Sequence, residues 1–273
     1  MNKKIKITLG TAAISLAAIA PAAFVVSCGS ENKDSKPTFE SRNNTFEKAL
    51  QTLKSSYSIE PYKVKIVNWH DGDTPKVKFL DKKIWGRPGV DIKTGIAKIR
   101  IASIDTPEIG TGGYGGKPYA PTTGDEYKYA KAGKDLADKI MPVGTTVSVF
   151  TSFSQTYDRI AGSIFFDSDN NGSFESSWAV TIMNKGLTLP FVSSPNDVID
   201  ENNILHYIGI PFADAFNYAY NNKIGMFSKN IEEISKIHGS TDFSSVKWHS
   251  ADNDSAPRNV YDYYKAWEEI NAE

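Results

Sequence analysis

Apolar and polar residues alternate strictly along two neighbouring segments of the chain. Val64 and Ile66 alternate with lysines in the first segment, and Val77 and Phe79 do so in the second. A period of two indicates strands with one buried face. The sequence Asp71-Gly72-Asp73-Thr74 lies between the segments and is rich in turn-forming residues. The pattern therefore predicts a β-hairpin.

The pattern predicts further strands and then helices. Additional strands are expected at 99–102, 146–150 and 160–166, and helices at 123–140, at 177–185 and from Pro211 onward. Thr123 and Glu126 form a capping-box pattern at a helix start, and proline is favourable at the first helical position. This order of elements predicts an α+β fold, in which a small antiparallel β-barrel of about five strands is packed against about three helices.

The first residues are typical of an exported protein. Lysines at positions 3, 4 and 6 precede an apolar run over 7–26, and Cys28 follows directly. The layout predicts a secretory signal. An uncleaved membrane anchor is the alternative, which the many alanines and Pro21 weaken. Cys28 is the only cysteine, so it has no internal disulfide partner, and its position resembles the lipobox of bacterial lipoproteins.

These features give a domain plan. We expect a signal peptide at 1–27, a lipidated Cys28 with a linker and short helix over 28–61, a barrel domain over 62–228, and a helical extension over 229–273. A diacyl anchor would hold the protein at the extracellular face of the cell membrane, with partial secretion as an open alternative. The sequence gives no sign of a protein partner, and we expect a monomer.

The charge balance argues against a general polyanion-binding body. Removing residues 1–27 removes three lysines and no acid, leaving 28 basic and 32 acidic residues. Proteins that bind nucleic acid by charge alone are strongly basic. Any polyanion would have to be bound at a local site, a condition that mildly favours an enzyme over a pure binding module.

Two acidic motifs carry the candidate chemistry. Asp73 follows the first strand, and Ile104-Asp105-Thr106-Pro107-Glu108 follows the third, with Arg100 just upstream. Carboxylates at strand ends can bind a hard cation through oxygen. A guanidinium beside them is reasonable if a phosphate lies between the arginine and the cation. The motifs predict metal-assisted cleavage of a phosphodiester.

With these residues the chain resembles the thermonuclease (micrococcal nuclease) family, whose core is an OB-fold barrel. The resemblance covers roughly residues 62–227. It depends on the motif at 71–74, on Ile99-Arg100-Ile101 leading into the motif at 104–108, and on Tyr157-Asp158-Arg159. It implies a calcium-dependent nuclease of low sequence specificity that cleaves DNA or RNA to 3′-phosphate products.

The resemblance also implies a role for each matching residue. Asp73 and Asp105 would bind Ca²⁺ through their carboxylates, and Thr106 through its backbone carbonyl. Glu108 would be the general base. The remaining candidates are two arginines that hold the phosphate and a tyrosine that lines the site: Arg100, Arg159 and Tyr157.

Several positions depart from the family pattern. Pro75 stands where a β-branched residue is usual and suggests a strand edge or a bulge. Asp158 could pair with Arg159, and Phe191 alone remains where the family offers stacking tyrosines. Two alternatives therefore stay open: a surface lipoprotein that binds nucleic acid or mediates adhesion after catalysis has lapsed, and a transport-associated substrate-binding lipoprotein. The acidic segment 167–172 resembles the start of a calcium loop, but a hairpin turn is the preferred interpretation.

Overall fold

The computed structural model describes residues 61–112, 118–191 and 203–237. At its centre is a closed barrel of five strands: β1 (Tyr62–Trp69), β2 (Pro75–Phe79), β3 (Ile96–Ile101), β7 (Thr146–Phe150) and β9 (Arg159–Phe166). The barrel closes because β9 pairs with both β3 and β7. This is the OB-like α+β fold that the sequence predicts, with one difference: β3 and β9 run parallel, so the barrel is mixed rather than antiparallel.

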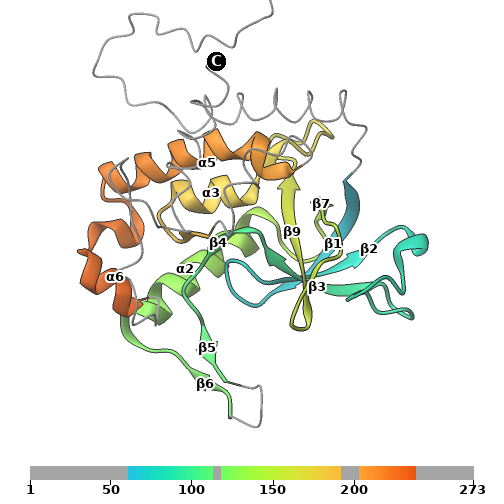
Figure 1. Cartoon of the computed structure of the whole chain (residues 1–273), viewed down its shortest axis with the longest axis horizontal. Coiled ribbons are helices and arrows are strands. Elements are labelled where there is room, and N and C mark those ends of the chain that lie inside the picture. Colours follow the sequence, from blue (N-terminus) through green and yellow to red (C-terminus); the bar gives the residue numbers. More distant parts are fainter. Residues whose placement is uncertain (1–60, 113–117, 192–202, 238–273) are drawn as a thin grey trace, which may run out of the picture. The chain divides into compact units, whose positions relative to one another are not determined.

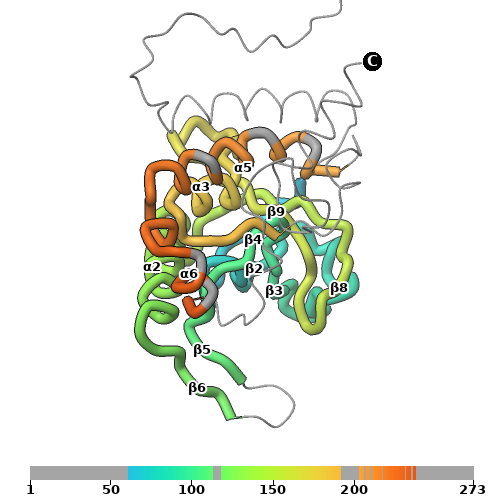
Figure 2. The backbone as a smooth tube through the Cα atoms, turned by 60° about the vertical axis from the view of Figure 1, so that its left-hand side comes forward, coloured from blue at the N-terminus to red at the C-terminus, as the bar shows by residue number. Residues whose placement is uncertain are grey.

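Shorter elements complete the described chain. The remaining strands are β4 (Ser103–Asp105), β5 (Gly110–Thr111), β6 (Ala120–Pro121), β8 (Gln155–Thr156), β10 (Ser176–Ser177) and β11 (Leu189–Phe191). The helices are α2 (Gly124–Ile140), α3 (Trp178–Asn184), α5 (Ile204–Asn221) and α6 (Ile231–Ile237), with 3₁₀ turns η1 (Lys82–Ile84) and η2 (Gly225–Ser228). β5 and β6 pair with each other and extend away from the barrel (Figure 2).

The alternating residues of the hairpin fill the barrel interior as predicted. Val64, Ile66, Val77 and Phe79 are at most 1% exposed, whereas the lysines between them face outward. α3 lies between the barrel and α5 (Figure 1). All seven residues of α3 are buried, as expected for a helix that is apolar on every side.

The helix after residue 203 corrects the sequence-based prediction. α5 starts at Ile204, not at Pro211, and Pro211 lies inside it. Asn203 caps the start by accepting a hydrogen bond from the backbone nitrogen of Leu205. An interior proline removes one helical hydrogen bond. The buried side chains on both sides of Pro211 offset this cost, because they extend one apolar face over the whole helix.

Two further expectations are met in part. Thr123 occupies the N-cap position of α2 but makes no side-chain capping bond. Pro75 is the first residue of β2 and lies opposite Trp69 of β1. The pairing of β2 with β3 starts one residue later, at Lys76, so the missing N–H of Pro75 removes no hydrogen bond to β3. β2 is not an edge strand; the irregularity lies in β1, between Ile66 and Asn68.

Some predicted segments fall outside the described residues. These are the signal region 1–27, Cys28, the linker and helix up to residue 60, and the extension from residue 238 onward. Within the described part of the extension, α6 packs against α2, and Ile234 and Ile237 join the buried core. No described helix combines the length and the apolar character that crossing a bilayer requires.

Candidate functional site

The turn after β1 holds two aspartates in fixed positions. Asp71 Oδ1 accepts hydrogen bonds from the backbone nitrogens of Asp73 (3.0 Å) and Thr74 (2.7 Å), so it closes the turn. The carbonyl of Gly72 accepts a bond from Trp178 Nε1 at 2.8 Å, which fixes the turn to α3. The carbonyl of Asp73 accepts the backbone nitrogen of Ile101 at 2.9 Å. The turn is therefore attached to both the barrel and the helical layer.

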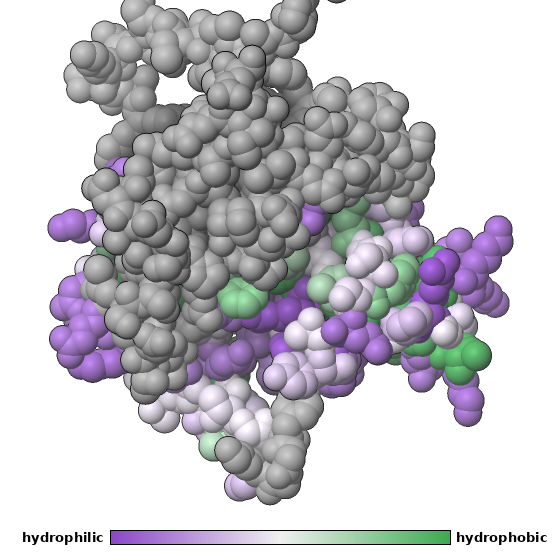
Figure 3. Space-filling view, viewed as in Figure 1, coloured by the Kyte–Doolittle hydropathy of each residue, from purple (hydrophilic) through white to green (hydrophobic). Residues whose placement is uncertain are grey.

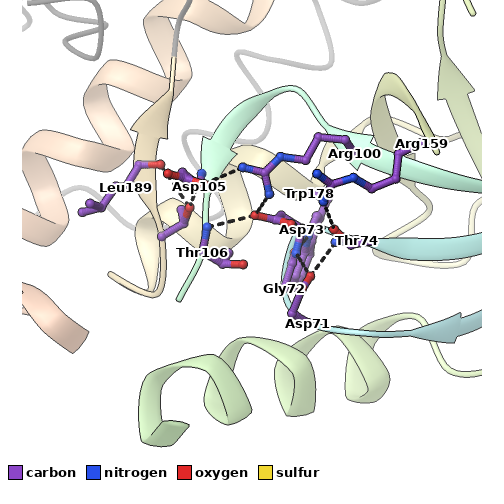
Figure 4. A network of polar contacts seen from close by, with 11 residues as sticks. Asp71, Gly72, Asp73, Thr74, Arg100, Asp105, Thr106, Arg159, Trp178 and Leu189 are labelled. Atoms are coloured by element: carbon purple, nitrogen blue, oxygen red, sulfur yellow. Dashed lines mark hydrogen bonds and ion pairs between the residues drawn. The ribbon is translucent and has the colours of Figure 1, made fainter. Parts of the chain in front are cut away.

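The two acidic motifs meet at Arg100. One arm of its guanidinium is ion-paired with Asp73 Oδ2, and the other lies 2.5 Å from Asp105 Oδ1 (Figure 4). Asp73 Oδ2 also accepts the backbone nitrogen of Thr106 at 3.0 Å. Because one guanidinium contacts both carboxylates, their oxygen atoms lie on either side of a single small group. The structure thus brings together four of the predicted site residues.

Charge and burial set the protonation of the cluster. Burial alone would raise the pKa of the Asp73 carboxyl, but the Arg100 charge and hydrogen bonds from Thr106 and Thr74 outweigh it, so the pKa lies below its usual value. Burial would lower the pKa of Arg100, and the charges of Asp73 and Asp105 raise it instead. Both effects favour the ionised pair.

Glu108 lies close enough to the Arg100 cluster for the charges of Asp73, Arg100 and Asp105 to shift its pKa. Burial and then the negative charge of Asp73 raise its pKa to about 7, although Arg100 and Arg159 act in the opposite direction. Its backbone carbonyl accepts a hydrogen bond from Thr122 Oγ1 at 2.5 Å. Glu108 is thus held by the segment that leads into α2.

A cavity of about 700 Å³ opens beside the cluster. Its wall includes Glu108, Arg159 and Tyr157, so these predicted residues share one space, while Asp73 itself is fully buried behind it. Arg159 Nη1 donates to Thr74 Oγ1 at 3.3 Å, and Thr74 Oγ1 donates to Asp73 Oδ1 at 2.8 Å. Thr74 therefore links the second arginine to the acidic cluster.

The turn between β8 and β9 presents an aromatic ring to solvent. Thr156 pairs with Arg159, so Tyr157 and Asp158 form a two-residue turn. Tyr157 has φ 58° and is 88% exposed. A non-glycine residue in this region carries strain, and such strain is concentrated at functional sites. Asp158 pairs with Lys98 at 2.5 Å, whereas the sequence suggested Arg159 as its partner.

The sequence interpretation missed several groups on the cavity wall. Asp71 lines the cavity, and burial, followed by the charges of Asp73 and Glu108, raises its pKa to about 8. Tyr119 also lines it and is 54% exposed, whereas Phe191 is not part of the wall. Thr74 could have been recognised from its place in the first motif. Nothing in the local sequence distinguishes Tyr119.

A second acidic group lies elsewhere. Ligand atoms of Asp167, Asp169 and Glu175 lie within 4.8 Å of one another in the loop between β9 and β10. These strands pair antiparallel, so the segment is the hairpin turn that we preferred. Backbone nitrogens of Asn171 and Gly172 donate to Asp167 and hold the loop.

Comparison with known proteins gives two relatives. The chain is 25% identical over 219 residues to the uncharacterized lipoprotein MG186 homolog of Mycoplasma pneumoniae, covering 66% of this chain and 70% of the relative. It is 29% identical over 170 residues to the uncharacterized lipoprotein MG186 of Mycoplasma genitalium, covering 61% of each. No protein-family profile matches the chain. Both relatives are lipoproteins by name, a result that supports a lipoprotein anchored to the membrane through lipid.

Proposed function

We propose that this lipoprotein is a calcium-dependent nuclease of low sequence specificity. It hydrolyses phosphodiester bonds of DNA or RNA at the extracellular face of the cell membrane, where lipid on Cys28 anchors it. The 3′-phosphate end of its products is what the thermonuclease resemblance implies.

One observation carries the proposal. The Arg100 guanidinium contacts carboxylates from two separate loops, and Glu108 and Arg159 share the adjoining cavity. Beside this ion pair the Glu108 carboxyl has a pKa raised to about 7, and perturbed pKa values of this kind are concentrated at functional sites. A carboxyl with that pKa can accept a proton at neutral pH, which is the property required of a general base.

The donor set suits a hard divalent cation. Asp73 and Asp105 offer carboxylate oxygens on neighbouring loops, and Thr106 offers a backbone carbonyl between Asp105 and Glu108. Oxygen ligands of this type are those that Ca²⁺ prefers, and nitrogen or sulfur donors are not needed. When bound, the ion supplies positive charge that offsets the charge of the phosphodiester.

The protein's own residues supply the remaining steps. Glu108 accepts a proton from the attacking water. Arg100 and Arg159 bind the phosphate oxygens and stabilise the negative charge that grows on them in the transition state. Tyr157, exposed on the cavity wall, offers an aromatic surface to the adjoining nucleotide.

A second function is favoured by the same ion pairs. Arg100 already contacts both Asp73 and Asp105, so each carboxylate has a cationic partner within the protein. A lipoprotein that binds nucleic acid without cleaving it would have the same arrangement. Metal-dependent turnover distinguishes this alternative from the nuclease.

The test is plasmid digestion by the full-length protein in detergent, with Ca²⁺, Mg²⁺ or EDTA. We expect cleavage with Ca²⁺, none with EDTA, and a rate lowered by about 10²–10⁴-fold in Glu108→Gln. Undiminished cleavage by Glu108→Gln would refute the assigned base. Binding of the plasmid without cleavage under every condition would favour the alternative.

A further inference from the structure

Four lysines form a continuous strip on the outer face of the barrel. We use the name lysine strip for Lys65 on β1, Lys76 and Lys78 on β2, and Lys98 on β3. Lys65 lies directly opposite Lys78, and Lys76 lies directly opposite Lys98. The four lysines therefore form two pairs across three adjacent strands. The two pairs are separated by two residues along β2, which is about 7 Å.

This pairing has a cost for the fold. Like charges directly opposite each other on neighbouring strands lower stability. Within the described residues, Lys65 and Lys76 take part in no ion pair, and Lys78 lies over the ring of Trp85. Lys98 pairs with Asp158, and both side chains are 41% exposed. Repulsion within the strip is thus only partly offset inside the protein, although the chain has a net charge of −1.

The strip leads into the cavity of the candidate site. Lys76 and Lys98 form part of its wall, together with Arg159 and Glu108. The second pair, Lys65 and Lys78, continues from there along the barrel surface. In Figure 3 hydrophilic residues protrude among apolar ones on the side where Figure 1 shows the ends of β2 and β3.

We propose that the lysine strip binds the phosphate backbone of a single nucleic-acid strand as it leaves the candidate site. This inference depends on the proposed function for the identity of the ligand. Lysines act as point charges on flexible stems and contact phosphates without reading bases, in keeping with low sequence specificity. The face of strands β2 and β3 is also where OB-folds bind oligonucleotides.

Continuity with the cavity favours a nucleic-acid strand over a lipid surface. A bilayer seated on Lys65 and Lys78 would adjoin the cavity that Lys76 and Lys98 line, and would obstruct entry of a polymer. A strand held at Arg159 instead continues over both pairs. The strip therefore extends the site from a single phosphodiester to a run of several phosphates.

The experiment measures how binding depends on salt and on strand length. The parent is full-length Glu108→Gln in detergent with Ca²⁺, which slows turnover. Its affinity for a fluorescent dinucleotide and for a strand of about sixteen nucleotides is measured by anisotropy. The test variant adds Lys65→Gln and Lys78→Gln. The charge-preserving variant adds Lys65→Arg and Lys78→Arg, and the matched control adds Lys131→Gln and Lys139→Gln on α2, outside the cavity wall.

The slope of the logarithm of the binding constant against the logarithm of the salt concentration measures the number of phosphate contacts. Removing two contacts to a single strand lowers the magnitude of this slope by about 1.4. Between about 50 and 200 mM salt, the parent should then lose about sevenfold more affinity for the long strand than the glutamine variant does. The arginine variant and the α2 control should follow the parent. The glutamine variant should also lose most of the advantage of the long strand over the dinucleotide.

Equal slopes for the parent and the glutamine variant would overturn the proposal. So would a glutamine variant that binds nucleic acid like the parent but loses binding to vesicles of anionic lipid. Unfolding curves of each variant separate binding from folding. Plasmid cleavage by the unsubstituted protein is measured in parallel: cleavage with equal slopes rejects the strip alone, whereas a slope difference without cleavage rejects the nuclease and keeps the strip.

Discussion

Two glycines face the same methyl group of Ile182, and the structure predicts opposite effects for the same substitution at each. A Cβ added at Gly72 would lie 2.8 Å from Ile182 Cδ1 and 2.9 Å from Thr106 Cγ2. A Cβ added at Gly133 would lie 3.5 Å from Ile182 Cδ1 and 3.7 Å from the Cα of Gly72, both ordinary contacts. Neither glycine has the positive φ that would disfavour alanine.

The magnitudes follow from these contacts. Gly72→Ala overpacks a buried contact on two sides and should lower the free energy of unfolding by about 1–3 kcal/mol. Gly133 lies inside α2, where alanine is favoured over glycine by up to about 1 kcal/mol. Gly133→Ala should therefore be neutral or stabilising, and the unfolding free energies of the two variants should differ by about 1–4 kcal/mol.

Urea unfolding followed by tryptophan fluorescence measures this difference. Trp69 and Trp178 are buried, with ring centroids 5.3 Å apart, and report on the same region. Adding Ile182→Val to Gly72→Ala removes one of the two close contacts and should recover part of the lost stability. Gly72→Ala as stable as the wild type, or equal losses at both glycines, would refute the packing argument.

Three further outcomes follow from the charges of the site. The pKa of Asp71 is about 8 in the folded state, above its ordinary value of 3.8, so between about pH 4 and pH 8 the folded state binds one more proton than the unfolded state. In EDTA, the unfolding free energy of the wild type relative to that of Asp71→Asn should therefore fall as pH rises from about 4 to about 8. Asp158→Asn should change stability by no more than about 1 kcal/mol, since the pair with Lys98 is exposed, but it should lower KM for nucleic acid at low salt by removing a negative charge from the cavity wall. The cleavage rate should rise with pH through about 7 as Glu108 loses its proton, and Glu108→Gln should lack this rise; a flat wild-type profile over this range would contradict the assigned base.

Local patterns predicted the part of the fold that depends on neighbouring residues. The β1–β2 hairpin followed from alternation and turn residues. The position of Arg100 on the outer face of β3 follows from the buried residues on either side of it, Ile99 and Ile101. The direction in which β9 meets β3 is a long-range property, and alternation carries no information about it. The start of α5 was missed because Pro211 has the local signature of a first turn, whereas burial along the whole helix decides its length.

The site shows the same division. Asp73, Asp105 and Glu108 could be found because each belongs to a short motif at a strand end. The Lys98–Asp158 pair joins residues 60 positions apart, and Tyr119 reaches the cavity through the β5–β6 pairing. The local sequence does not predict the lysine strip, for a related reason. Each lysine is an ordinary outward residue of its strand, and only the register places the ammonium groups opposite one another.

The position of Arg100 limits how its variants can be interpreted. It holds Asp73, which is fully buried, so replacing it by leucine would leave a buried charge without its ion partner and should destabilise the protein by about 3–5 kcal/mol. Loss of cleavage in such a variant would reflect folding as well as transition-state binding. Among the described residues, Arg159 makes a single 3.3 Å bond to the Thr74 hydroxyl, and it is partly exposed, so its removal disturbs the fold less. Arg159→Leu should therefore lose activity while it keeps near-wild-type unfolding, and it is the variant that separates a catalytic guanidinium from a structural one.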